Sequence, residues 1–300
     1  MTRQIKADLS LLGMTAIWGL SFPLMKNVLE HIPSFPYLSL RFLIATLVLV
    51  ILFFGRLRKI NGRTAIVGCL IGFLMFGGMA LQVCGLYYTS ASNSAFITGM
   101  NVVFVPIVSS LLLRKKPDIS SVFGVILAFG GLFFLTGGLD FNFNLGDLLT
   151  LLCAICWTFQ IIYIDKYTNE MDPVLLCILQ IAFSTLLYFG VWGGINPGPI
   201  TLDSTVMVVL LVTGVLGTAL AFAVQTSVQR FTSPTHTALI LTAEPVFGAL
   251  FAATIPNSAG VTETLKLHTL AGCLLILGGM LICELKVVEK LSGRLHKAQG

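Results

Sequence analysis

Long apolar stretches of similar length follow one another along the chain, separated by short segments that carry Pro, Gly and polar residues. A helix needs about 20 mostly apolar residues to cross a bilayer. Ten stretches have this length: 8–29, 36–54, 65–87, 93–113, 119–137, 146–164, 173–193, 205–228, 234–255 and 267–285. The pattern predicts an all-α integral membrane protein with ten transmembrane helices and without a soluble domain.

The composition supports this fold class. Hydrophobic residues make up 56% of the 300 residues and charged residues 10%, whereas soluble domains carry roughly a quarter charged residues. The seven cysteines lie within or beside apolar stretches, which argues against a disulfide framework. Cys153-x-x-Cys156 has the spacing of a metal or redox motif, but no second ligand pair is near it in the sequence. Buried apolar cysteine is the better interpretation, and we expect neither a metal nor a cofactor.

The net charge of +5 does not indicate nucleic-acid binding, because the basic residues form no basic domain. If the N-terminus is cytoplasmic, nearly all basic residues fall on the cytoplasmic side: Arg3, Lys6, Arg56, Arg58, Lys59, Arg63, Arg114, Lys115, Lys116, Lys166, Arg230, Lys286, Lys290, Arg294 and Lys297. The outer loops hold only Lys266. The first apolar stretch is too long for a signal peptide. We therefore expect a multi-pass protein of a bacterial plasma (inner) membrane, with both termini cytoplasmic.

The two halves of the chain resemble each other. The pattern Gln-x5-aromatic-Thr-Ser that begins at Gln82 recurs at Gln225, and Gly-x5-Gly-Gly at Gly124 recurs at Gly272. These matches occur in the same order in both halves. Each repeat would hold five helices, an odd number, so the second must enter the membrane in the opposite sense. We predict two inverted five-helix repeats, residues 1–140 and 141–300, an arrangement that is common in secondary transporters.

Three short motifs then point to a family. Trp18-Gly-Leu-Ser-Phe, Arg41-Phe in the second helix and Glu244-Pro-Val-Phe in the ninth resemble the drug/metabolite transporter superfamily, above all its EamA-type group. The resemblance covers nearly the whole chain, but a loop at 256–266 is longer than the family pattern. It implies five plus five helices and a substrate site between the halves, lined by helices 1, 3, 4, 6, 8 and 9. Its members move amino acids, sugars, nucleotide sugars and other metabolites.

Charged groups inside a membrane are costly and usually face a cavity or a partner. Glu244 could bind a cationic substrate group or a proton, or serve as a structural carboxylate. Pro245 should loosen the turn before it. Arg41 could recognise a carboxylate or phosphate, or extend to the interface, and Lys26 is more typical of the interface.

Further candidates for the pathway are polar or aromatic residues within the apolar stretches. Each also has a structural interpretation as interhelical hydrogen bonding or packing. They are Gln82, Gln225, Asn101 (the repeat equivalent of Glu244), Trp18, Trp157 and the titratable His236.

These features together favour a secondary transporter that moves small organic metabolites by alternating access, with export as the expected direction. No phosphate-binding Gly-rich loop is present, so a proton or ion gradient, or passive exchange, would supply the energy. The expected partners are the small-molecule substrate and the lipid bilayer, and homodimer formation stays open. A channel or a non-transporting sensor is the alternative. An intramembrane enzyme is disfavoured, because no cluster of nucleophile and base or of metal ligands appears at helical spacing.

Overall fold

The computed structural model describes residues 3–29, 31–89, 91–114, 116–137, 144–195, 200, 202–256, 262, 264–286 and 288. These residues form helices and no strand. Nine helical stretches in this part are long and apolar enough to cross a membrane, and Ile119–Leu135 is a shorter apolar helix. The all-α membrane fold expected from the sequence is confirmed. Lys115, Lys290, Arg294, Lys297 and part of the 256–266 loop lie outside the described residues.

Several helices begin where a side chain can accept the first free backbone N–H groups. Asp172 caps its helix in this way and is followed by Pro173 at the first position, while Asn144 and Asp147 form a capping box. The helices of the first half are α1 (Arg3–Val28), α2 (Ser34–Leu52), the short η1 (Phe54–Lys59), α3 (Gly62–Gly85), α4 (Ala91–Gly99), α5 (Asn101–Leu112) and α6 (Ile119–Leu135). Those of the second half are α7 (Leu145–Tyr167), α8 (Pro173–Gly194), α9 (Ser204–Gly214), η2 (Val215–Leu220), α10 (Ala221–Val228), η3 (Gln229–Phe231), α11 (Pro234–Leu241), α12 (Glu244–Ala252) and α13 (Leu267–Glu284).

Three of the predicted helices are divided. The fourth is split into α4 and α5 at Met100, and the ninth into α11 and α12 at Thr242 and Ala243. The residues at both splits keep helical backbone angles, so each split is a kink rather than a loop. The eighth runs through α9, the π-helical segment η2 and α10.

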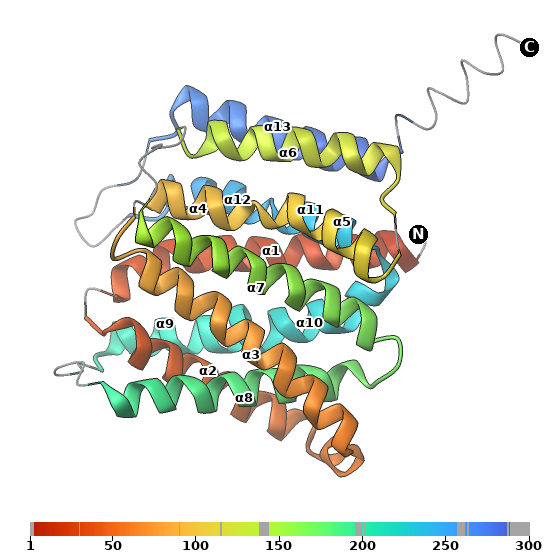
Figure 1. Cartoon of the computed structure of the whole chain (residues 1–300). Helices are drawn as coiled ribbons and strands as arrows, with labels where there is room; N and C mark the ends of the chain where they lie inside the picture. Colours follow the sequence, from red (N-terminus) through yellow and green to blue (C-terminus); the bar gives the residue numbers. More distant parts are fainter. Residues whose placement is uncertain are drawn as a thin grey trace, which may run out of the picture.

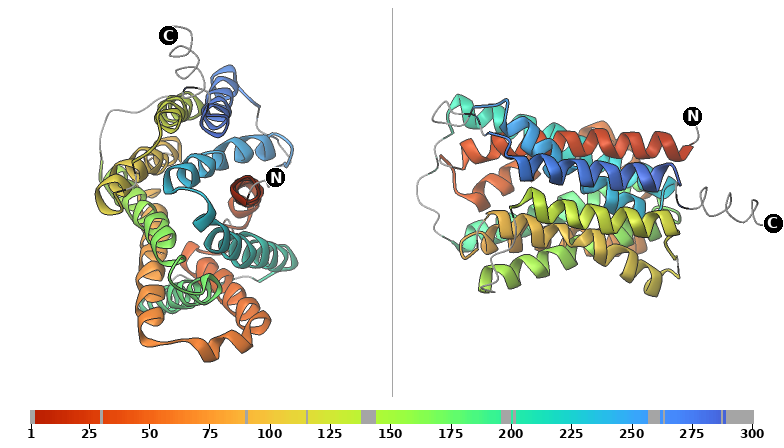
Figure 2. Two further views of the ribbon diagram at one scale, coloured as in Figure 1. Left: turned by 90° about the vertical axis from the view of Figure 1, so that its right-hand side faces the viewer. Right: turned by 90° about the horizontal axis from the view of Figure 1, so that it is seen from above.

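The helices pack side by side in one elongated bundle (Figures 1 and 2). The pair α6 and α13 forms one edge of the bundle, and the pair α2 and α8 lies at the opposite edge. The other pairings occur in matched sets. α7 packs on α3, α4 and α5, and α1 packs in the corresponding way on α10, α11 and α12. Within the described residues, the principal neighbours of α1 all belong to the second half of the chain.

The α6–α13 pair is held by close backbone contact at glycines. A Cβ atom on Gly131 would lie 2.7 Å from the carbonyl oxygen of Gly272, and one on Gly124 would lie 2.7 Å from that of Gly279. The glycine nearer the end of α6, Gly131, meets the glycine nearer the start of α13, Gly272. The two helices therefore run antiparallel. Small residues let helices approach closely where lipid supplies no hydrophobic force between them.

The outer surface of the bundle is apolar. Large hydrophobic side chains on many helices are strongly exposed, with Leu111 at 76%, Ile51 at 73% and Leu274 at 71%. Soluble monomers rarely expose apolar area on this scale. The exposed surface is therefore typical of a protein whose apolar helices are surrounded by lipid.

The connections that carry most basic residues lie at one end of the bundle. The start of α1, the segment between α2 and α3, and the ends of α5, α7, α10 and α13 all meet there (Figure 1). The two described ends of the chain are thus on the same side.

Candidate functional site

Each of the two kinks is followed at once by a polar residue inside the apolar layer. Glu244 begins α12 and Asn101 begins α5. Pro245 has no N–H to donate to the carbonyl of Leu241, four residues earlier, so the helix loosens there as the sequence predicted. The kink at Met100 has no proline at the matching position, and the sequence did not predict it.

Glu244 and Asn101 both keep part of their surface accessible. Within the described part of the chain, neither side chain has a hydrogen-bond partner, and the polar atoms of both keep some accessible surface. A polar group at this depth is costly unless it meets a partner or water. Both residues are therefore suited to a ligand or a proton that enters the bundle.

Arg41 lies in α2 and is only 2% exposed. Its Nε donates to Thr218 Oγ1 at 2.7 Å, Nη2 donates to the carbonyl of Gly217 at 3.3 Å, and Nη1 contacts the sulfur of Met25 at 3.2 Å. Among the described residues, no carboxylate oxygen lies within 4.0 Å of the guanidinium. An arginine has five N–H donors, so some remain for an anion.

Both residues nevertheless border α1: Arg41 contacts Met25 of α1, and α12, which begins at Glu244, packs along α1. Opposite charges attract strongly in a medium of low dielectric constant, even without direct contact. The structure thus places a carboxylate and a guanidinium in the same interior region, as a separated pair rather than as a salt bridge. Such a pair matches a small molecule that carries both a positive and a negative group.

Trp18 joins this region through the π-helical segment. Its indole Nε1 donates to the carbonyl of Gly217 at 2.8 Å, and its ring packs against Phe222 with ring centroids 5.1 Å apart. Gly217 therefore accepts N–H groups from both Trp18 and Arg41. Single π turns within helices are rare and occur often at functional sites.

We expect Trp18→Phe to lower the stability of the folded protein by about 1 kcal/mol, the usual net value of one hydrogen bond. Phenylalanine keeps the ring contact with Phe222 but has no N–H for Gly217. The thermal unfolding midpoint of the purified protein measures the effect. Trp192→Phe is the matched control, because Trp192 stacks on Phe189 and no hydrogen bond of its indole is found in the described part. Equal shifts for both variants would contradict the assigned role of the Gly217 contact.

Gln82 and Trp157 lie in a second region, where α3 meets α7. Gln82 Nε2 donates to Thr98 Oγ1 at 3.3 Å. The indole of Trp157 covers Gly78, where a Cβ atom would lie 2.9 Å from Cε2. Both side chains keep some accessible surface. Cys153 is fully buried beside Thr98, and all seven cysteines are free.

Gln225 and His236 lie apart from Arg41 and Glu244. Gln225 is 1% exposed, and its amide nitrogen is 3.5 Å from the side-chain oxygens of Gln160 and Gln229. His236 is 5% exposed near the start of α11, at the end of the bundle where α1 begins. The side chain of Lys26 lies outside the described part.

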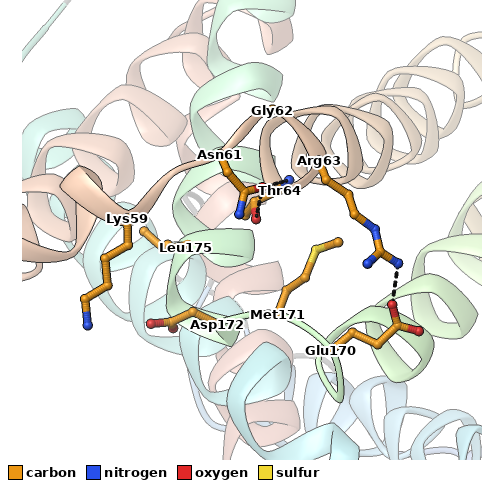
Figure 3. A pocket seen from close by; sticks show the side chains of 9 residues that line it. All are labelled: Lys59, Asn61, Gly62, Arg63, Thr64, Glu170, Met171, Asp172 and Leu175. Carbon is orange, nitrogen blue, oxygen red and sulfur yellow. Dashed lines mark hydrogen bonds and ion pairs between the residues drawn. The ribbon is translucent and has the colours of Figure 1, made fainter.

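An open hollow of about 540 Å³ lies between the start of α3 and the α7–α8 connection (Figure 3). Arg63 forms an ion pair with Glu170 across it, and Arg56 forms one with Asp172 nearby at 2.8 Å. These pairs are exposed, so each contributes at most about 1 kcal/mol. They join the two halves at the surface and are far from the interior charges.

A model of the EamA-like transporter family matches the chain twice, over residues 5–137 and 144–284. The chain belongs to the EamA-like transporter family. It is a multi-pass membrane protein of a transporter family, as the sequence motifs predicted.

Relatives of this EamA-like protein are also named as transport proteins. It is 33% identical over 285 residues to an uncharacterized transporter of Archaeoglobus fulgidus, covering 95% of this chain and 88% of the relative. It is 24% identical over 290 residues to a protein of Salmonella typhimurium named a probable amino-acid metabolite efflux pump, covering 90% and 91%. A solved crystal structure superposes with a TM-score of 0.79 over 93% of this chain and 98% of that chain, at 16% identity, which shows a shared fold.

Sequence reasoning missed Gly217 and Thr218, which bind Arg41 and Trp18 in the EamA-like fold. Glycine and threonine in an apolar stretch are ordinary in membrane helices. The only signal was their place in helix 8, which the family resemblance had put around the substrate site.

Proposed function

We propose that this protein is a secondary transporter that exports small organic metabolites, amino acids or compounds like them, by alternating access. The observation that carries the proposal is Glu244, a partly accessible residue at a kink in the middle of a membrane helix, in a bundle that also buries the guanidinium of Arg41 without a salt bridge between the two. The relative named a probable amino-acid metabolite efflux pump supports the class of substrate.

A zwitterionic amino acid fits the separated charges. Its ammonium group would pair with Glu244, and its carboxylate would take the remaining N–H donors of Arg41. A proton and an ammonium group compete for the same carboxylate. A carrier in which each displaces the other exchanges an entering proton for a leaving substrate, so a proton gradient would drive export.

Alternating access requires two similar halves that exchange conformations. We take residues 1–140 and 141–300 as inverted repeats. The two family-model matches, the matched helix pairings, the equivalent kinks and the antiparallel α6–α13 contact support this division. The excess of basic residues at one end of the bundle supports a plasma-membrane orientation with both termini cytoplasmic.

Flux in proteoliposomes tests the proposal. We expect saturable transport of one or more amino acids or related metabolites, accelerated by a pH gradient. Glu244→Gln keeps the shape of the side chain but removes the charge, so it should lower gradient-driven flux at least tenfold. Glu170→Gln is the matched control, because Glu170 is an exposed carboxylate. Gel filtration of both variants shows that they are folded.

The other possible outcomes distinguish the alternative functions. Saturable flux that is unchanged in folded Glu244→Gln would keep the carrier and make Glu244 structural. Conductance that does not saturate would favour a channel. Absence of flux over a wide panel of metabolites would favour a non-transporting sensor.

A further inference from the structure

Three metal-binding side chains meet at the end of the bundle where α1 begins. One ligand atom each from Asp8, His236 and Glu284 lies within 4.8 Å of the others. They come from α1, α11 and α13. Asp8 and His236 are 228 positions apart in the sequence. All three line a cavity of about 220 Å³ whose other walls are largely apolar.

Asp8 is the least satisfied of the three. It is only 8% exposed, and neither of its carboxylate oxygens has a partner within hydrogen-bond distance in the described part of the chain. Thr232, Glu284 and Gln4 lie near the Asp8 carboxylate without forming a hydrogen bond of good geometry to it, and the hydroxyl of Thr232 is also buried without one. A buried carboxylate without a partner costs several kcal/mol while it is charged, so Asp8 favours a bound cation or a proton.

The surrounding charges are mostly negative. Asp118 Oδ2 lies 3.9 Å from His236 Nε2, and the charges of Asp8 and Glu284 act on each other. Lys286 is the basic residue whose charge reaches His236 and Glu284. Gln4 lies with its amide nitrogen 3.5 Å from His236 Nδ1. Within the described part of the chain, three carboxylates near the imidazole attract a divalent ion, and the charge of Lys286 opposes them.

The geometry points to a binding site for a divalent transition-metal ion of the zinc type, formed by Asp8, His236 and Glu284. One imidazole and two carboxylates are a common ligand set for such ions, whereas Mg²⁺ and Ca²⁺ prefer oxygen ligands alone. Zinc forms bonds of about 2.0–2.2 Å to such ligands, so the three side chains would have to move toward a common point from separations of up to 4.8 Å. Asp118 Oδ2, 3.9 Å from His236 Nε2, would have to move closer to hydrogen-bond and orient the imidazole ring.

An ion bound there would join the start of α1, in the first half, to α11 and α13 in the second. It would hold this end of the bundle closed and slow any cycle that opens it. The binding site stands without the proposed transport function, whereas this regulatory effect rests on it.

The first test is zinc binding by the purified full chain, stripped of metal and kept reduced. Titration of Zn²⁺ against a coloured chelator should give one ion per chain with a micromolar or lower Kd. Asp8→Asn and His236→Gln should each weaken binding at least tenfold. The controls Glu170→Gln and His268→Gln, which alter a carboxylate and an imidazole elsewhere, should bind as the wild type does. Zn²⁺ should also raise the unfolding temperature of the wild type but not that of His236→Gln. This second variant tests the site if Asp8→Asn does not fold.

The site is overturned if the wild type binds no Zn²⁺, or if folded His236→Gln and Glu284→Gln bind it unchanged. Cys283 lines the same cavity, so Cys283→Ser is included. Loss of binding in that variant alone would replace the proposed ligand set with a thiolate. Inhibition of flux by Zn²⁺ in the wild type and not in Asp8→Asn would support the regulatory effect. Zinc binding in a protein without flux would uphold the site and overturn the transport function instead.

Discussion

Replacing Gly272 with leucine is expected to abolish the folded protein. A Cβ atom at this position would lie 2.5 Å from the carbonyl oxygen of Gly131, and it would also clash with the backbone of Leu135. Backbone atoms cannot move aside as a flexible side chain can, so α13 would have to separate from α6. Inserting even a methylene group into a packed core costs about 1–3 kcal/mol, and leucine adds several. Membrane extracts should show no monodisperse peak on gel filtration.

Gly278 provides the matched control on the same helix. A Cβ atom there has no atom within 4 Å, so Gly278→Leu should give a normal gel-filtration peak. Gly272→Ala should fall between the two, with a lowered unfolding temperature. A stable Gly272→Leu protein would mean that α6 and α13 do not pack as closely as the structure has them.

Arg41→Lys is expected to lower flux at least tenfold while the protein stays folded. Lysine keeps the positive charge but cannot reproduce the planar set of donors that binds Thr218 and Gly217. The π-helical segment would lose its link to α2, and a substrate carboxylate would lose its remaining donors. Concentration dependence of flux should show the loss mainly as a raised KM if Arg41 binds substrate.

Arg56→Lys is the control, because Arg56 lies at the surface and pairs with Asp172. It should leave flux unchanged. Full flux in folded Arg41→Lys would show that charge alone is needed at this position. A variant that fails to fold would be followed by Thr218→Val, which removes the acceptor for Arg41 Nε and the hydroxyl donor to the carbonyl of Thr213.

Most helix positions could be predicted from the sequence, because length and local capping decide them. The stretch 173–193 became Pro173–Gly194, since Asp172 and Pro173 together define a helix start. The stretch 267–285 became Leu267–Glu284. The kink at Met100 and the π turn at Val215–Leu220 were missed, because one extra or one lost backbone hydrogen bond leaves no mark on an apolar pattern.

The candidate site was predictable in its charges but not in its contacts. Glu244 and Arg41 stand out in the sequence because charge is rare in apolar stretches. Their relation through space depends on how α2, η2 and α12 pack, which periodicity does not reveal. The meeting of Asp8, His236 and Glu284 was likewise hidden, because ligands on three separate helices have no characteristic spacing.

The dependence of α1 on the second half has a consequence for synthesis. α1 ends at Val28, whereas α9, the earliest of its principal neighbours, begins at Ser204, so 175 residues (29–203) are made between them. At about 5–20 residues per second, α1 waits for roughly 10–35 s before its partners exist. During that time its buried face, with Asp8 and Trp18, must rest against lipid, the insertion machinery or helices that it later leaves. The first helix to be made is therefore among the last to reach its final place.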